Sequence, residues 1–202
     1  MTEKLSESIS SKKEGFFYRK FELCNNTNGG RWEMTLYRWK KNEIVNVIMD
    51  SEKKNRYLLN CSWDPLKPCV TFIMINPSEG NEEIADRTLR RCVNFSSTWG
   101  FGSMSVVNLF SQITSDPDQL LEPLPEEISE NNKYINLAIS EAKFVIFGWG
   151  ELEKDFISRV KEVKNFVPLE KQFCIKKTAD GRYPRHPLFL SAELTPIPWI
   201  GD

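Results

Sequence analysis

The feature that most constrains the fold is the stretch of residues 71–91, TFIMINPSEGNEEIADRTLRR. It begins with a continuous apolar run rich in β-forming side chains, which is typical of a strand buried on both faces of a parallel sheet. We expect the strand to stop before Pro77, because a proline restricts the backbone of the residue that precedes it. Helical spacing of apolar residues then resumes at Asp86. Open α/β sheets bind ligands outside the carboxyl ends of their strands, so we expect a site near Asn76, Asp86, Arg90 and Arg91.

The rest of the chain repeats this alternation of strand and helix. Apolar runs predict further strands at residues 104–109, 144–147 and 172–175, and helical periodicity predicts helices at residues 86–99, 126–143 and 151–164. Residues 31–40 and 56–61 are typical of the strands of a short antiparallel element. The pattern predicts an α/β fold with a mostly parallel, four-stranded central sheet flanked by helices and an N-terminal antiparallel β extension. We accordingly divide the chain into an extension, residues 1–55, packed on the body, and an α/β domain, residues 56–202.

Composition and cysteine usage limit the class of protein. A chain of 202 residues, 40% of them hydrophobic, is long enough for one domain with a substantial core. No apolar run approaches the ~20 residues that span a bilayer, and residues 1–14 lack the apolar segment of a signal peptide. The five cysteines are scattered without a CxxC pair, and there is one histidine, so we expect reduced thiols and no metal site. We predict a cytoplasmic protein that uses no cofactor and has no membrane partner.

Charge is distributed unevenly along the chain. The formal net charge is −1, but residues 116–155 carry ten acidic side chains against three lysines, and residues 159–185 carry eight basic side chains against three acidic ones. A local excess of positive charge is compatible with a nucleic-acid partner. Solvated helix faces explain the same pattern, so the charge distribution leaves both interpretations open.

Asp86 and the two adjacent arginines each have two interpretations. Asp86 suits a helix N-cap, whose carboxylate accepts hydrogen bonds from the first turn, but it could equally serve as a general base. Arg90 lies four residues later, so an ion pair with Asp86 is the structural alternative. Two arginines near the start of a helix oppose the helix dipole. That placement favours a bound anion, such as a phosphate, near Arg90 and Arg91.

Several motifs resemble those of DUF1643, a bacterial and phage family named for its unknown function. The motifs are RYLLNCSWD, FIMINPS, DRTLRR, VVNLF, FGWG and RHPLFL, and the resemblance covers about residues 56–190. A fainter likeness leads to the uracil-DNA glycosylase superfamily. It is carried by residues 75–78, 107–109, 147–149 and 186–190, which follow the superfamily's motifs in the same order and at the same strand ends. This likeness implies a glycosylase-like α/β sandwich, a DNA partner and base flipping. For such an enzyme we expect a role in conflict between phage and host.

The glycosylase likeness also implies a division of chemical roles. Cleavage of an N-glycosidic bond leaves positive charge on the sugar and negative charge on the departing base, so the site must place a water and stabilise the base. The likeness implies that Asn76 holds the water through its amide carbonyl, that His186 donates a hydrogen bond to the leaving base, and that Asn108 recognises the base edge. The structural alternatives are a turn before Pro77, a structural histidine, and an amide bonded to loop backbone.

Further residues of the matched motifs are expected at the substrate: Ser78, Gly148, Trp149, Arg185 and Leu190. Trp149 could stack on a base or pack in the core, and Leu190 falls where the superfamily places its wedge residue. The late motif reads HPLFL where the superfamily has HPSPL, and the first motif has Asn where the fastest uracil enzymes have Asp. Because of these departures, an unusual or modified base is at least as plausible a substrate as uracil.

Two hypotheses from different classes follow. The first is a metal-independent DNA glycosylase-like enzyme that hydrolyses the N-glycosidic bond of an unusual or modified base. The second is a non-catalytic α/β module that binds a nucleotide or nucleic acid through Arg90, Arg91 and His186. Release of a free base from DNA separates the two. The sequence leaves open the identity of the base, the preference for single- or double-stranded DNA, and the oligomeric state.

Overall fold

A mixed sheet forms the centre of the protein in the computed structural model, which describes residues 36–152 and 156–200. In these residues the sheet has seven strands in the order β2-β3-β6-β4-β7-β8-β9. The strands are β2 (Ile44–Met49), β3 (Arg56–Ser62), β4 (Cys69–Met74), β6 (Ser103–Asn108), β7 (Ala142–Phe147), β8 (Gln172–Cys174) and β9 (Ile197–Pro198). Two short strands, β1 (Tyr37–Arg38) and β5 (Ile84–Ala85), pair with each other in a separate antiparallel sheet.

The four predicted strands form the parallel centre of this sheet. β6, β4, β7 and β8 are neighbours in that order, and each adjacent pair is parallel. The prediction of a mostly parallel four-stranded centre is therefore confirmed. The complete sheet is larger, because β2 and β3 extend it on one side and β9 on the other, all by antiparallel pairing.

The N-terminal strands differ from the prediction. Strand β3 was expected in a separate antiparallel element, but it pairs with β6 within the main sheet, with Leu59 opposite Val106. The unpredicted strand β2 lies inside the expected extension of residues 1–55 and pairs with β3. Of the strand expected at residues 31–40, the structure describes only residues 36–40, in which β1 occupies two positions. The remainder of that prediction lies outside the described residues.

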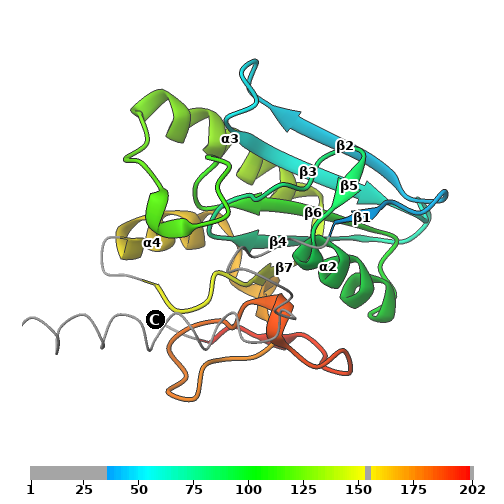
Figure 1. The fold of residues 1–202 in the computed structure, drawn as a ribbon. Coiled ribbons are helices and arrows are strands. Elements are labelled where there is room, and N and C mark those ends of the chain that lie inside the picture. The colour runs from blue at the N-terminus through cyan, green and yellow to red at the C-terminus, as the bar shows by residue number, and fades with distance from the viewer. Residues whose placement is uncertain (1–35, 153–155, 201–202) are drawn as a thin grey trace, which may run out of the picture. The chain divides into compact units, whose positions relative to one another are not determined.

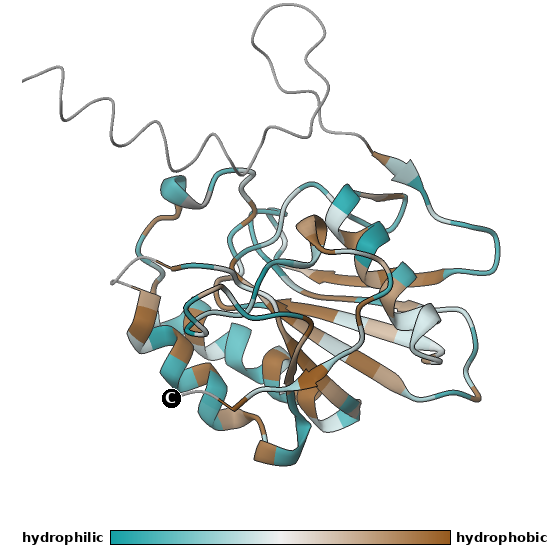
Figure 2. Ribbon diagram, turned by 90° about the horizontal axis from the view of Figure 1, so that it is seen from below, coloured by the Kyte–Doolittle hydropathy of each residue, from teal (hydrophilic) through white to brown (hydrophobic). Residues whose placement is uncertain are grey.

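Helices cover the two faces of the sheet. Helix α2 (Arg87–Thr98) packs on one face, where its buried residues join a core cluster with Phe72 and Val106. Helices α3 (Pro125–Glu141) and α4 (Ile157–Phe166) pack on the other face, in a cluster with Ile73 and Val107. Figure 1 shows α2 on one side of the sheet and α3 with α4 on the other. The central strands are mostly hydrophobic in Figure 2 because both of their faces are covered.

The helices begin close to their predicted positions, with one exception. The prediction that helix α2 follows Asp86 is confirmed, and α3 starts one residue before its predicted start. Helix α4 begins at Ile157 rather than at the predicted Glu151, and residues 153–155 lie outside the described part. Short 3₁₀ turns are η1 (Pro117–Gln119), η3 (Leu169–Lys171) and η4 (Pro187–Phe189).

Two further sequence expectations concern thiols and membranes. The cysteines at positions 61, 69, 92 and 174 are free thiols, as predicted, while Cys24 lies outside the described residues. Burial raises the pKa of the Cys61 thiol to about 12, so this side chain stays protonated and behaves as an apolar core residue. None of the helices in residues 36–152 and 156–200 is long and apolar enough to cross a bilayer.

Candidate functional site

The carboxyl ends of β4, β6 and β7 meet at one edge of the sheet. The Leu109 amide donates to the Met74 carbonyl at 2.8 Å, and the Phe110 amide donates to the Ile75 carbonyl at 2.9 Å. On the other side of β4, the Gly148 amide donates to the Ile73 carbonyl at 2.9 Å. Three of the four motif pieces, at residues 75–78, 107–109 and 147–149, are therefore adjacent.

The fourth piece, residues 186–190, lies against the same strand ends. A β-carbon placed on Gly148 would stand 3.0 Å from Pro187 Cδ and 3.7 Å from Met74 Cγ, so this glycine allows Pro187 to approach both strands closely. Met74 is itself the partner of Asn108 in the β4–β6 ladder. The Arg91 guanidinium donates to the Leu190 carbonyl and attaches this segment to α2. All four pieces thus gather around the end of β4.

Asn76 follows β4 directly, and the loop that follows β6 fixes its amide. The Nδ2 group donates to the Thr114 carbonyl at 2.7 Å and to the Pro77 carbonyl at 3.0 Å. Both of these bonds use Nδ2, the described residues donate none to Oδ1, and the residue is half-buried. This arrangement stabilises the turn before Pro77, as the structural interpretation expects, and it leaves the carbonyl oxygen available to a water.

Asn108 ends β6 with an amide that the fold buries without a partner. The residue is 1% exposed, and neither Nδ2 nor Oδ1 has a hydrogen bond within the described residues. Side chains alternate along a strand, so Asn108 faces the α2 side together with Met104 and Val106. The expected alternative, an amide bonded to loop backbone, is not what the structure has. Leaving a buried amide unpaired costs about 1–3 kcal/mol, and buried polar groups normally find a protein, water or ligand partner.

The main chain of Asn108 is, in contrast, held firmly from the other face of the sheet. The Asn131 amide on α3 donates to the carbonyls of Asn108 and Leu109 at 3.0 and 3.1 Å. Arg159 on α4 donates through Nε to the Leu109 carbonyl at 2.8 Å and pairs with Glu162 at 2.7 Å. The strand end is therefore held firmly, while the Asn108 side chain has no bonding partner among the described residues.

Asp86 is the N-cap of α2, which confirms the capping interpretation. Its Oδ1 accepts from the Leu89 amide at 2.8 Å, and its Oδ2 accepts from the Ser78 hydroxyl at 2.7 Å. The residue is 6% exposed. Both oxygens have structural partners, so Asp86 links the loop after β4 to the start of α2. Its alternative role as a general base stays a prediction.

Arg56, which sequence reasoning placed only at the start of a strand, is a buried cation beside this loop. It is 2% exposed, and its Nη1 donates to the Gly80 carbonyl at 2.5 Å, while its Nε has no partner among the described residues. Burial lowers the pKa of Arg56 to about 10, although the nearby Asp86 carboxylate acts to raise it.

A β-bulge aims Arg56 toward this site. Ile48 pairs with Leu58 and Met49 with Arg56, so Tyr57 is an extra residue on β3. Tyr57 stacks on Tyr134 of α3, with ring centroids 5.5 Å apart, on the opposite face of the sheet. In the sequence, the signal for Arg56 was a charged residue at the start of the apolar run RYLLNC. The direction of its side chain could not be read from the sequence, because it depends on the bulge.

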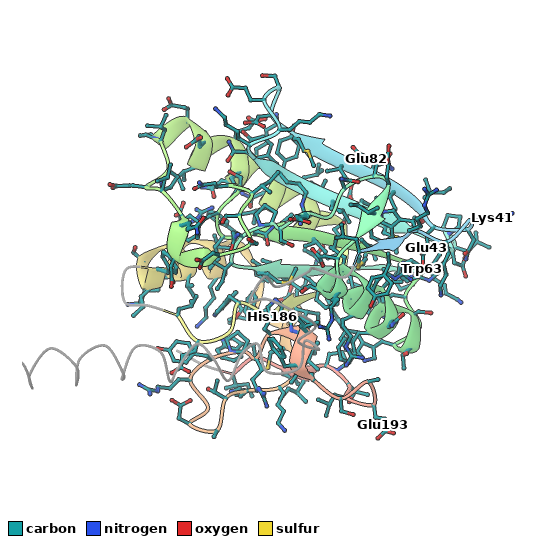
Figure 3. All side chains as sticks on the ribbon, viewed as in Figure 1. Lys41, Glu43, Trp63, Glu82, His186 and Glu193 are labelled. Carbon is teal, nitrogen blue, oxygen red and sulfur yellow. The ribbon has the colours of Figure 1, made fainter. Side chains whose placement is uncertain are left out.

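The two adjacent arginines of α2 are engaged with the protein itself. Arg90 forms a two-pronged pair with Glu43, with nitrogen–oxygen distances of 2.6 and 2.9 Å, so the structural alternative of an ion pair with Asp86 is replaced by an ion pair with Glu43. Glu43 lies well away from His186 in Figure 3. Arg91 lies over the Phe95 ring at 4.8 Å and donates to the Leu190 carbonyl. Phosphate binding by either arginine stays a prediction.

His186 and Arg185 introduce the last motif. The His186 Nδ1 atom accepts from the Leu188 amide at 3.3 Å, which caps η4. A neutral imidazole with an accepting Nδ1 carries its proton on Nε2, which makes that nitrogen the donor. The Arg185 amide donates to the Lys176 carbonyl at 2.7 Å, and both side chains are half-buried.

Comparison with known families gives one match. A family model described as protein of unknown function (DUF1643) matches residues 56–188. The chain belongs to the DUF1643 family. The matched part begins at Arg56, as expected, and ends two residues before the expected limit at residue 190. It includes each strand of the parallel centre. No curated protein and no solved structure matches the chain.

Two residues of this DUF1643 chain that were expected at the substrate lie in the core. Trp149 is 2% exposed and packs against Phe147, with ring centroids 4.6 Å apart, which is the packing alternative. Leu190 is 6% exposed and belongs to the cluster under α2. A wedge role would require Leu190 to leave this cluster, whereas Leu188 and Phe189 are half-buried. Contact of Trp149 and Leu190 with substrate stays a prediction.

Proposed function

We propose that the protein is a DNA glycosylase-like enzyme that hydrolyses the N-glycosidic bond of an unusual or modified base. The observation that carries this proposal is the buried amide of Asn108 at the carboxyl end of the parallel sheet, which has no partner in residues 36–152 and 156–200. An amide presents one donor group and one acceptor side by side, which suits the edge of a nucleobase. A base bound there would supply the two missing hydrogen bonds.

The neighbouring groups fit the two remaining tasks of the reaction. Asn76 Oδ1, whose amide is oriented by Thr114, would accept a hydrogen bond from the attacking water and place it against the sugar. His186 would donate from Nε2 to the base as negative charge develops, because its Nδ1 already accepts from Leu188. The water's proton would pass to solvent or to the departing base, since an amide is a poor base. Slow turnover is the consequence.

The likeness to the uracil-DNA glycosylase superfamily supports this proposal. The four motif pieces that carry it stand on adjacent strand ends of one sheet, as a shared site requires. Asn108 is closed from solvent, so a base would reach it only after a neighbouring loop has moved. The segment of residues 186–190 is the candidate for this movement, because Pro187 covers the end of β4.

A non-catalytic nucleotide- or nucleic-acid-binding module is the second candidate. The observation that favours it is the full engagement of Asp86, whose two carboxylate oxygens accept from Leu89 and Ser78. With that carboxylate occupied, the amide of Asn76 and the ring of His186 would have to carry the chemistry. A binding module needs only recognition of the base by Asn108.

Base release under single-turnover conditions tests the proposal. DNA carrying a panel of modified bases is incubated with excess protein, and free base and alkali-labile sites are measured. Asn76→Ala and His186→Ala should each slow release about 10²–10³-fold, the typical cost of one well-aimed hydrogen bond to developing charge. Asn136→Ala, which alters an exposed asparagine on α3, is the matched control and should leave release unchanged.

The alternative outcomes are distinct. Wild-type protein that releases no base from any member of the panel, yet binds the DNA, would favour the binding module. Variants whose activity falls only in proportion to folded protein, judged by thermal melting, would make Asn76 and His186 structural residues.

A further inference from the structure

Strand β2 forms one edge of the seven-stranded sheet, and it is built differently from the strand at the other edge. It pairs with β3 on one side only, and Figure 1 shows it as the outermost strand there. Proteins usually protect such edges with very short strands, charged side chains or proline, because unpaired backbone groups otherwise pair with another chain. The opposite edge, β9, has two residues, one of which is Pro198. In contrast, β2 has six residues, without a charge or a proline.

The alternation of hydrogen bonds shows which residues of β2 point toward β3. In an antiparallel pair, successive residues direct their N–H and C=O groups alternately toward and away from the partner strand. The Trp63 amide donates to the Gly102 carbonyl at 2.9 Å, in register with the β3–β6 pairs, so the odd-numbered residues of β3 point toward β6. The even-numbered residues of β3 consequently point toward β2, where their partners are Ile44, Asn46 and Ile48.

It follows that Val45, Val47 and Met49 direct their backbone groups away from β3. The bond from the Asp50 amide to the Asn55 carbonyl agrees, because Asp50 continues the series of even-numbered residues that face β3. No residue of the ranges 36–152 and 156–200 donates to or accepts from these outward backbone groups. The edge therefore offers donors and acceptors to a further strand.

The side chains of β2 are apolar at most positions and partly open to solvent. Ile44 is 68% exposed, and four more apolar residues are half-buried: Val45, Val47, Ile48 and Met49. Val45 and Val47 extend the core cluster on the α2 side of the sheet, and Ile48 extends the cluster on the other side. A strand added at this edge would cover apolar surface on both faces of the sheet.

We propose that β2 pairs with β2 of a second copy of the chain, antiparallel and about a twofold axis, so that the two sheets become one. Twofold symmetry is the commonest arrangement of soluble oligomers, and it requires a surface that is complementary to itself. In the proposed register Asn46 lies opposite Asn46 of the other copy. Val45 then lies opposite Val47 of the other copy, and outward-facing residues opposite each other exchange two hydrogen bonds.

The side chains explain why the occupant is a second copy rather than an unrelated strand. Ile44 meets Ile48 of the other copy on one face, and Val45 meets Val47 on the other, so apolar groups cover apolar groups. Asn46 is exposed and lies on the axis, opposite its own copy. Each amide offers a donor and an acceptor, so two amides can form a reciprocal pair of hydrogen bonds. An apolar side chain at this position of a foreign strand would leave the Asn46 amide unsatisfied.

Charge favours the antiparallel direction. The turn before β2 carries Lys40 and Lys41, whereas the turn of residues 50–54 carries two acidic side chains and two lysines and is neutral. Antiparallel pairing brings a basic turn beside a neutral one at each end, while parallel pairing would bring two basic turns together. An interface formed by one pair of strands is small, and small interfaces are typical of weak complexes. We therefore expect a dimer that depends on concentration.

Sedimentation velocity of the full chain over a range of concentrations tests the proposal. The mass of the wild type should rise toward twice that of the 23.5 kDa chain. Asn46→Lys places two like charges opposite each other on the axis, so this variant should stay monomeric. Val47→Pro should also stay monomeric, because the N–H that it removes points away from β3 and the fold does not use it. The control is Asn165→Lys, at an exposed asparagine of α4, which should dimerise like the wild type.

Hydrogen exchange followed by NMR locates the contact. The amides of Val45 and Val47 should become protected as the concentration of the wild type rises, and they should stay unprotected in Asn46→Lys. The amides of Asn46 and Ile48 face β3, so they should be protected in both proteins at every concentration.

Three outcomes would overturn the proposal. The first is a wild type that stays monomeric at every concentration, and the second is a dimer that Asn46→Lys leaves intact. The third is a monomer in which the Val45 and Val47 amides are nevertheless protected, which would show that another part of the same chain pairs with β2. Base release has no part in this test, because the proposal uses neither Asn76, nor Asn108, nor His186.

Discussion

Asn108 gives the candidate site its clearest residue-scale test, because stability and recognition should respond in opposite directions. Replacing a buried polar group that has no partner by an apolar group of similar size removes a desolvation penalty. We expect Asn108→Leu to raise the free energy of unfolding by about 1 kcal/mol, measured by urea denaturation, and to abolish base release.

The matched control is Asn131→Leu on α3. Asn131 donates to two buried carbonyls, those of Asn108 and Leu109, so its loss leaves acceptors unsatisfied. We expect this variant to be destabilised by about 1–3 kcal/mol. If Asn108→Leu is destabilised as much as Asn131→Leu, then the Asn108 amide has a bonding partner, such as an ordered water, and the argument from its isolation fails.

The pair of Glu43 and Arg90 makes a second residue-scale prediction, which concerns pH. Burial of Glu43 acts to raise its pKa. The hydrogen bonds from Arg90 and the Lys40 amide, and the charge of Arg90, act in the opposite direction. Their combined effect is larger, so the pKa of Glu43 lies below its usual value of 4.5. The side chains of Arg90 and Glu43 are 13% and 3% exposed. We expect Glu43→Gln to lower the free energy of unfolding at pH 7 by about 3 kcal/mol, as for other buried pairs that lose one partner.

The sign of the pH dependence follows from the lowered pKa. Ionised Glu43 stabilises the fold fully above pH 4.5, its pKa in the unfolded chain, and this contribution disappears as the pH falls through the lower pKa of the folded state. The difference between wild type and Glu43→Gln in urea denaturation should therefore shrink at acidic pH. Glu52→Gln, in an exposed pair with Lys54, is the control and should change stability far less than Glu43→Gln. A difference for Glu43→Gln that persists unchanged at pH 3 would argue against the ion pair.

At the scale of elements, the sequence predicted the parallel strands well because both of their faces are buried. Residues 71–75 and 144–147 are continuous apolar runs, and such runs are recognisable without knowledge of their neighbours. Strand β2 was missed because it is an edge strand with exposed and half-buried positions. Strand β3 was placed in the wrong sheet because pairing depends on residues about 45 positions away, such as Val106 opposite Leu59.

The site was predictable to the same extent. The positions of Asn76, Asn108 and Gly148 at strand ends were predictable, because polar residues and glycine interrupt apolar strands at their carboxyl ends. The direction of Arg56 was not predictable, since it depends on the bulge at Tyr57. The partner of Arg90 was also missed, because Glu43 lies 47 residues earlier in the chain and no local spacing joins them.

Helix α2 makes the element-scale prediction, which separates the two interpretations of Asp86. Asp86→Ala removes the cap and should lower the free energy of unfolding by about 1 kcal/mol, a typical value for an N-cap. Asparagine is an equally good cap, so Asp86→Asn should retain most of the stability. Because both carboxylate oxygens have structural partners, we also expect Asp86→Asn to retain base release. A loss of about 10² or more in rate with the fold intact would identify Asp86 as the general base instead.

At the scale of the whole molecule, stability should decline from the centre of the sheet to its edges. Strand β4 lies between β6 and β7 and contains fully buried residues such as Phe72 and Ile73. Strand β9 has two exposed residues at the edge, and β1 pairs with β5 through two residue pairs outside the main sheet. Local opening requires less free energy where few buried contacts are lost.

Hydrogen exchange measured by mass spectrometry at several low urea concentrations tests this gradient. We expect amides of β4, β6 and β7 to exchange only through global unfolding, with a free energy equal to that of urea denaturation and the same dependence on urea. Amides of β1 and β5, and the amides of β8 that face β9, should exchange through smaller openings. The free energy of these openings should depend only weakly on urea. The amides of residues 186–190 should show protection between these two classes. Contacts with Arg91 and Gly148 attach the segment to the centre of the protein, but the proposed entry of a base requires it to move. If this segment were as protected as β4, it would open only when the whole protein unfolds. That result would exclude the proposed route of a base to Asn108.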